Sequence, residues 1–90
     1  MNKSQQAQYD KTCDKIRDRL GSTNAIAIHS HKITGNIITG ETVRQWMVDR
    51  RIPTDFAFVL YELMDREINP LHLTPRLAQY VELKAAHNGT

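Results

Sequence analysis

Apolar residues recur along this chain at helical spacing, and the first such series lies near the N-terminus. It predicts a helix over residues 4–20, with Ser4 as the N-cap and Gly21 as the stop. The apolar face follows the spacing i, i+4, i+7, i+11 and consists of Tyr9, Cys13, Ile16 and Leu20. The residues between them are mostly charged, as expected of a face turned to solvent.

The next apolar stretch is compatible with two structures. Ser22 or Thr23 could cap a short helix that holds residues 25–28. The same alternation of Ala and Ile also suits a strand, which residues 34–36 would turn into a hairpin with residues 37–38. We expect the helix, with the hairpin as the alternative.

The third predicted helix covers residues 39–50. Thr39 suits the N-cap, and Val43, Trp46 and Met47 form an apolar stripe at i, i+3, i+4. Pro53 ends this segment, because the residue before a proline is disfavoured in helical conformation.

A fourth helix is predicted from residues 54–55 to about residue 66. Its apolar face consists of Phe56, Val59, Leu60 and Leu63. After a turn at residues 69–70, Thr74 followed by Pro75 predicts the start of a last helix with an apolar side made of Leu77, Val81 and Leu83. The sequence therefore predicts one all-α domain over residues 1–90, built of four to five short helices.

Composition and charge change this picture little, but the distribution of charge is informative. Hydrophobic residues make up 40% of the chain, charged residues 24%, and the net charge is +2. Residues 29–51 hold four Lys or Arg against two Asp or Glu, whereas residues 52–67 hold one against four. Clustering of cations matters more for nucleic-acid binding than net charge does.

The chain lacks the apolar run of about 20 residues that spans a membrane, and its polar start has no signal-peptide core. Cys13 is the sole cysteine, so no disulfide can form within the chain. We expect a cytoplasmic protein.

The segment over residues 38–53 carries the strongest functional signal. A helix that enters the major groove of DNA needs an apolar inner face and short polar groups in its first turn. Val43 and Trp46 suit the inner face, and Thr39, Gly40 and Glu41 suit the first turn.

Each remaining side chain of this helix has a matching chemistry in DNA. Arg44 can pair with guanine, Gln45 with adenine, and Glu41 can accept from cytosine or order a neighbouring arginine. Arg50 and Arg51, which follow the helix, are placed to contact phosphates. The candidate DNA-contacting residues are Lys32, Asn36, Thr39, Gly40, Glu41, Thr42, Arg44, Gln45, Arg50 and Arg51.

The series Ile38-Thr39-x-x-Thr42-Val43-x-x-Trp46 resembles the recognition-helix signature of lambda-repressor-like (Cro/CI-type) helix-turn-helix phage regulators. Residues 51–53, Arg-Ile-Pro, and the closing segment 71–77 are similar to the same family. The resemblance covers residues 23–77 and implies a helix-turn-helix bundle that binds an operator, commonly as a homodimer on a palindromic site. His31 stands where the family has glycine, so the turn before Thr39 is either enlarged or folded differently.

Other functions have weaker signals. His29 and His31 would share a face on a strand but not on a helix, so a zinc site is disfavoured and we expect no metal or cofactor. No nucleophile motif or phosphate-binding loop is present in the sequence, which favours a protein that is not an enzyme. The alternatives to a repressor are a protein-interaction module, such as an antitoxin or anti-repressor, and an architectural DNA protein.

Overall fold

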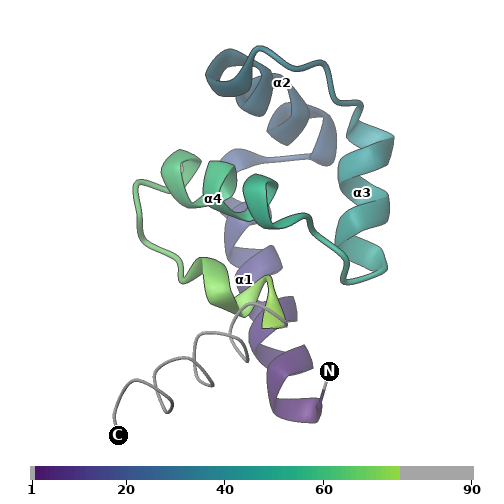
Figure 1. Ribbon diagram of the computed structural model, residues 1–90, viewed down its shortest axis with the longest axis vertical. Coiled ribbons are helices and arrows are strands. Elements are labelled where there is room, and N and C mark those ends of the chain that lie inside the picture. Colours follow the sequence, from purple (N-terminus) through teal and green to yellow (C-terminus); the bar gives the residue numbers. More distant parts are fainter. Residues whose placement is uncertain (1, 76–90) are drawn as a thin grey trace, which may run out of the picture.

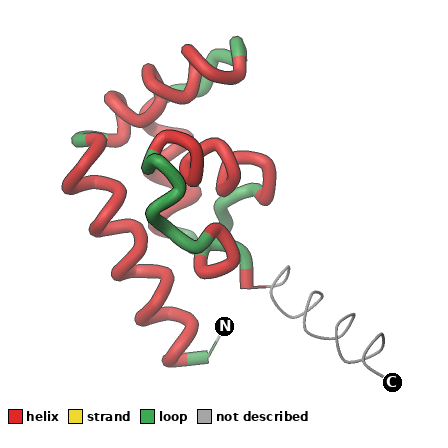
Figure 2. Tube along the Cα trace, turned by 90° about the vertical axis from the view of Figure 1, so that its left-hand side faces the viewer, coloured by secondary structure: helices red, strands yellow, loops and turns green. Residues whose placement is uncertain are grey.

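The computed structural model describes residues 2–75, and all regular structure in this range is helical (Figures 1 and 2). The elements are α1 (Lys3–Leu20), α2 (Thr23–Thr34), α3 (Gly40–Val48), α4 (Thr54–Leu63) and a short 3-10 helix, η1 (Pro70–His72). Because residues 2–75 contain no strand, the all-α prediction is confirmed for this range, and the hairpin alternative at residues 25–38 is wrong. The last helix, predicted from Thr74 through Leu83, falls almost entirely outside the described residues.

One hydrophobic core joins the helices. α2 packs against both α3 and α4, and Figure 1 shows α4 crossing in front of the upper part of α1, with α3 to its right. Each helix contributes residues at its predicted apolar positions, and the segment after α4 closes the core. The fully or nearly buried members are Tyr9, Cys13, Ile16, Ile26, Ala27, Val43, Met47, Ile52, Phe56, Ala57, Leu60, Met64, Ile68 and Leu73.

The N-cap of α1 lies two residues before the predicted one. Asn2, not Ser4, is the N-cap, because the Asn2 side chain accepts from the Gln5 amide at 2.8 Å and the Gln5 side chain accepts from the Asn2 amide at 3.0 Å. This reciprocal pair is a capping box, which satisfies two backbone donors at once. At the other end Gly21 is the C-cap, as predicted.

α2 is longer than the four residues that the sequence suggested. Ser22 caps it by accepting from the Ala25 amide at 3.2 Å, and it continues to Thr34. Its buried face consists of Ile26, Ala27 and Ser30. Gly35 ends the helix in the left-handed conformation, with φ of 73°, which glycine adopts at little cost.

α3 and α4 are shorter than predicted. α3 ends at Val48, not Arg50, and α4 ends at Leu63, not Arg66. Both ends are followed by residues in the left-handed conformation: Arg50 has φ of 54°, and Asp65 and Arg66 have φ of 53° and 64°. A left-handed residue cannot continue a right-handed helix, so each segment turns away from the helical path.

The predicted turn at residues 69–70 has regular structure. Asn69 caps η1 by accepting from the Leu71 amide at 3.0 Å.

Among residues 2–75, no helix has the combination of length and apolar composition that crossing a membrane requires.

Candidate nucleic-acid interface

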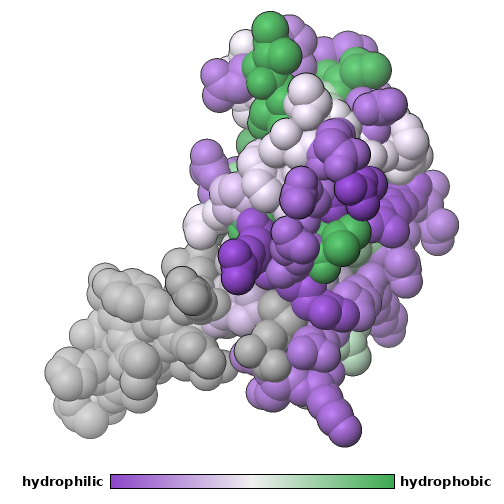
Figure 3. All heavy atoms as spheres, turned by 90° about the vertical axis from the view of Figure 1, so that its right-hand side faces the viewer, coloured by the Kyte–Doolittle hydropathy of each residue, from purple (hydrophilic) through white to green (hydrophobic). Residues whose placement is uncertain are grey.

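α3 presents two opposite faces. Gly40, Val43 and Met47 are buried, and Trp46 is half-buried with its ring centroid 5.0 Å from that of Phe56 on α4. The exposed residues follow the spacing i, i+3, i+4, i+7, which lines one side of a helix, and we call them the outer stripe of α3: Glu41, Arg44, Gln45 and Val48. Figure 3 views the side of the molecule on which α3 lies and shows many hydrophilic side chains over it.

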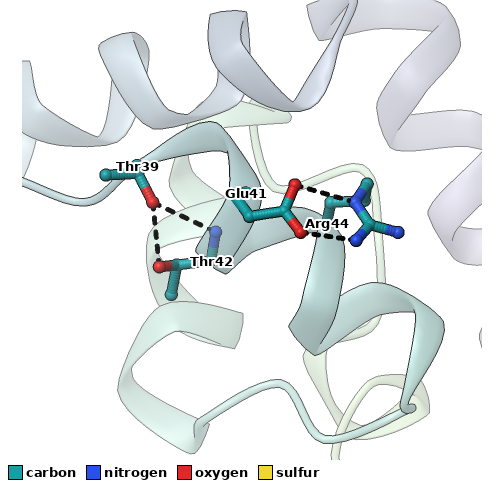
Figure 4. A network of polar contacts seen from close by, with 4 residues as sticks. All are labelled: Thr39, Glu41, Thr42 and Arg44. Carbon is teal, nitrogen blue, oxygen red and sulfur yellow. Dashed lines mark hydrogen bonds and ion pairs between the residues drawn. The ribbon is translucent and has the colours of Figure 1, made fainter.

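The first turn of α3 is held by its own hydroxyl groups. Thr39, the N-cap, accepts from the Thr42 amide at 3.2 Å through Oγ1, which lies 2.9 Å from Oγ1 of Thr42 (Figure 4). Thr39 is exposed and Thr42 is half-buried. The predicted cap is therefore confirmed, and the capping side chain lies at the surface.

Glu41 and Arg44 lie side by side on the outer stripe (Figure 4). Arg44 donates from Nε to Oε2 of Glu41 at 3.0 Å and from Nη2 to Oε1 at 2.5 Å. The hydrogen bond from Arg44 holds the pKa of Glu41 below its ordinary value, and the same contact raises the pKa of Arg44. The outer stripe thus carries one neutralised pair and not an isolated cation.

Gly40 has little accessible surface to offer a ligand. It is buried, and a Cβ atom built at this position would lie 1.8 Å from Oδ1 and 2.9 Å from Cα of Asn24 on α2. Its burial leaves little surface for the contact with DNA that the sequence predicted, and that contact stays a prediction. The absence of a side chain lets the start of α3 approach the start of α2.

The two arginines after α3 differ in their surroundings. Arg50 donates from Nε and Nη2 to the Asp10 carboxylate on α1, at 3.2 and 3.0 Å. Arg51 is exposed and pairs with no carboxylate among residues 2–75. Arg50 consequently holds the end of α3 against α1, whereas Arg51 has its charge available.

The approach to α3 contains the other two predicted contacts. Lys32 and Asn36 are both exposed. Nδ1 of His31 donates to the carbonyl oxygen of Asn36 at 3.1 Å, and the Asn36 amide donates to Thr34 Oγ1 at 3.1 Å. These bonds hold Asn36 against the end of α2.

Three features of α3 and its surroundings were not predicted. Val48 completes the outer stripe, and its spacing of seven from Glu41 could have revealed it. Ile37, 88% exposed, projects from the turn between α2 and α3. Tyr9 on α1 donates its hydroxyl hydrogen toward the carbonyl oxygens of Trp46 and Met47, at 3.1 and 3.2 Å. No local pattern signals that contact, because 37 residues separate its partners.

The histidines of α2 do not form a metal centre with their surroundings. His29 is half-buried and His31 is exposed, and two residues of separation on a helix place them on different sides. Within residues 2–75, no three His, Cys, Asp or Glu side chains are grouped closely enough to hold a metal ion.

Comparison with protein-family models, with curated proteins and with solved structures finds no match for this chain.

Proposed function

We propose that this protein is a sequence-specific DNA-binding transcription regulator of the lambda-repressor-like type. In this proposal α2, the turn over residues 35–39 and α3 form a helix-turn-helix unit, and α3 enters the major groove. The observation that carries the proposal is the outer stripe of α3, which is exposed along the whole helix while Val43 and Met47 anchor the opposite side. A groove about 12 Å wide accepts a helix presented in this way.

The charges around α3 support this orientation. Lys32 lies before the helix and Arg51 after it, and both are exposed without a carboxylate partner among the described residues. Cations on both sides of a recognition helix suit the two phosphate chains that border a groove. Between them, the exposed Gln45 and Arg44 have the hydrogen-bonding groups that read adenine and guanine.

The length of α2 shows how the chain accommodates its departure from the family pattern. His31 stands at a position expected to be glycine, yet α2 continues through it to Thr34. Gly35 then supplies the left-handed residue that ends the helix. In this proposal the unit is a helix-turn-helix whose first helix is extended and whose glycine is displaced by four residues.

A single short recognition helix reads only a few base pairs, and two-fold symmetry is the common way to extend the site. We therefore propose that the protein binds as a homodimer to a palindromic operator, as a Cro-like repressor of a phage or mobile element in the bacterial cytoplasm.

The test is selection of bound duplexes from a random DNA library, followed by a mobility-shift titration on the enriched sequence. We expect a palindromic sequence to be enriched. The double variant Arg44→Ala/Gln45→Ala should lose the preference for that sequence over random DNA, whereas the control Arg66→Ala, at an exposed position near the end of α4, should keep it. Absence of any enriched sequence, or a preference unchanged in the double variant, would contradict the proposal.

A second candidate function rests on α4. Phe58 is 46% exposed there, between the exposed acidic residues Asp55 and Glu62 at i−3 and i+4. An exposed aromatic with acidic neighbours suits contact with a protein that has a basic rim, such as the partner of an antitoxin or anti-repressor. A stable protein partner released by Phe58→Ala, with no enrichment of DNA by the wild type, would favour this function.

A further inference from the structure

The geometry of the Glu41–Arg44 pair leaves one edge of the arginine open. An arginine carries five N–H donors on three nitrogens. The Glu41 carboxylate accepts from Nε and from Nη2 of Arg44 (Figure 4), which is the side edge of the guanidinium. The end edge, formed by Nη1 and the second hydrogen of Nη2, donates to neither oxygen of Glu41 and can make another bidentate pair.

The open edge needs two acceptors side by side. In the major groove, guanine offers O6 and N7, both of them acceptors. Adenine offers one acceptor beside a donor, thymine one acceptor beside a methyl group, and cytosine a donor. Of the four bases, guanine therefore matches the open edge of Arg44.

Glu41 itself is poorly placed to read a base. Both of its carboxylate oxygens already accept from Arg44, so a cytosine amino group would have to share an oxygen with the guanidinium, a charged donor that binds it more strongly. Its contribution is instead to restrict Arg44, whose side chain is otherwise exposed and long. Restricting a side chain before binding lowers the entropy that is lost when the complex forms.

We propose that Glu41 is a positioning residue that orients Arg44 so that the open edge of its guanidinium reads a guanine in the operator. The inference rests on the proposed function and deepens it, because it names the base and separates the residue that reads from the residue that orients. The pair also has no net charge, so it sets specificity and adds little to the attraction of phosphates, which Lys32 and Arg51 supply.

The test compares selected sequences for the wild type, Glu41→Gln, Arg44→Lys and Gln45→Ala. The wild type should enrich a half-site with a guanine at one defined position. Arg44→Lys should reduce the preference for guanine over adenine there by roughly tenfold, since lysine lacks the planar fork. Glu41→Gln should reduce it at the same position by about threefold, as expected of a residue that acts through Arg44. Gln45→Ala should alter a different position and keep the guanine.

Preferences are compared as ratios between bases for each variant, because removal of the Glu41 charge raises affinity for all DNA. A Glu41→Gln variant that changes another position, or none, would overturn the positioning role. So would an Arg44→Lys variant that keeps the guanine. If the wild type enriches no sequence at all, the proposed function fails, and the inference fails with it.

A measurement on the protein without DNA tests the positioning role of Glu41 separately from the proposed DNA-binding function. Hydrogen exchange of the arginine Nε–H groups, followed by NMR, should be slower for Arg44 than for Arg51, which has no carboxylate partner among the described residues. The difference should disappear in Glu41→Gln. Equal exchange at Arg44 and Arg51 in the wild type would overturn the positioning role even if DNA selection succeeds.

Discussion

At the scale of single residues, Gly40 decides how closely two helices approach. Alanine in place of glycine within a helix usually stabilises it by about 1 kcal/mol. At Gly40 the added Cβ would meet the Asn24 backbone at 2.9 Å as well as its side chain. We expect Gly40→Ala to lower the free energy of unfolding by about 1–3 kcal/mol, since the two helices must move apart. Urea unfolding followed by Trp46 fluorescence measures this.

Gly35→Ala is the matched control for Gly40→Ala. No atom lies within 4 Å of a Cβ at Gly35, and the cost there comes from its left-handed backbone, with φ of 73°. That cost is about 1–2 kcal/mol, without displacement of α3. We therefore expect Gly40→Ala, and not Gly35→Ala, to shift the emission of the folded protein, because Trp46 packs on Phe56. A Gly40→Ala protein as stable as the wild type would contradict the close approach.

Two buried groups on α1 make the free energy of unfolding fall at alkaline pH. Burial raises the pKa of the Cys13 thiol from 9.0 to about 11, and burial also raises the pKa of Tyr9 far above its ordinary value of 10.0. Between pH 9 and 11 the unfolded chain releases the Cys13 proton while the folded protein keeps it, so the free energy of unfolding falls as pH rises. The un-ionised Cys13 thiol contributes of the order of 2 kcal/mol to the free energy of unfolding. This contribution is present in full below pH 9 and is lost as the pH rises to about 11.

Urea titrations at intervals from pH 7 to pH 11 check this dependence. Cys13→Ala should lose less stability than the wild type between pH 9 and 11, because only Tyr9 then contributes in this window. Equal losses in the two proteins would show that the thiol does not resist ionisation in the folded state.

At the scale of elements, the end of α3 separates two arginines that are adjacent in the chain. Arg50 is bound to Asp10 of α1, whereas Arg51 is available. In the proposed complex, Arg51→Ala should weaken binding to every DNA sequence and reduce the dependence of log K on log salt by about one ion for each protomer. Arg50→Ala should change the salt dependence less, because its charge is already neutralised.

Mobility-shift titrations at several salt concentrations compare the two variants, with specific and random duplexes for each. A larger change in salt dependence for Arg50→Ala than for Arg51→Ala would mean that Arg50 leaves Asp10 to reach a phosphate. A loss confined to the specific duplex would instead make Arg51 a base-reading residue.

At the scale of the whole molecule, the proposed interface carries few available cations. Lys32 and Arg51 are exposed without carboxylate partners among residues 2–75, and Arg44 is paired. A dimer that uses these two residues from each protomer neutralises about four phosphates, so log K should fall with log salt with a slope of about −3 to −4. A slope near −2 would indicate a monomer, and a much steeper one would require cations beyond this surface.

The positions of the helices could be predicted from the sequence, because helical periodicity is a local property. Val43 and Met47 repeat at the spacing of one face, and Thr39 has the side chain that caps a helix. The C-terminal ends of α3 and α4 could not be predicted in the same way. Arg50 turns left-handed where it binds Asp10, and the segment after α4 is held where Arg19 donates to the carbonyl of Met64 at 2.9 Å.

The candidate interface also has a part that the sequence predicts and a part that it does not. The sequence by itself determined the outward residues of α3, since Glu41, Arg44 and Gln45 follow from the spacing of their apolar neighbours. Only the tertiary structure decided that Gly40 is buried, that Arg50 is committed to α1, and that Arg51 is not. The physical reason is that these states depend on atoms contributed by Asn24 and Asp10, which folding brings beside α3 from other helices, and no spacing within α3 encodes where they lie.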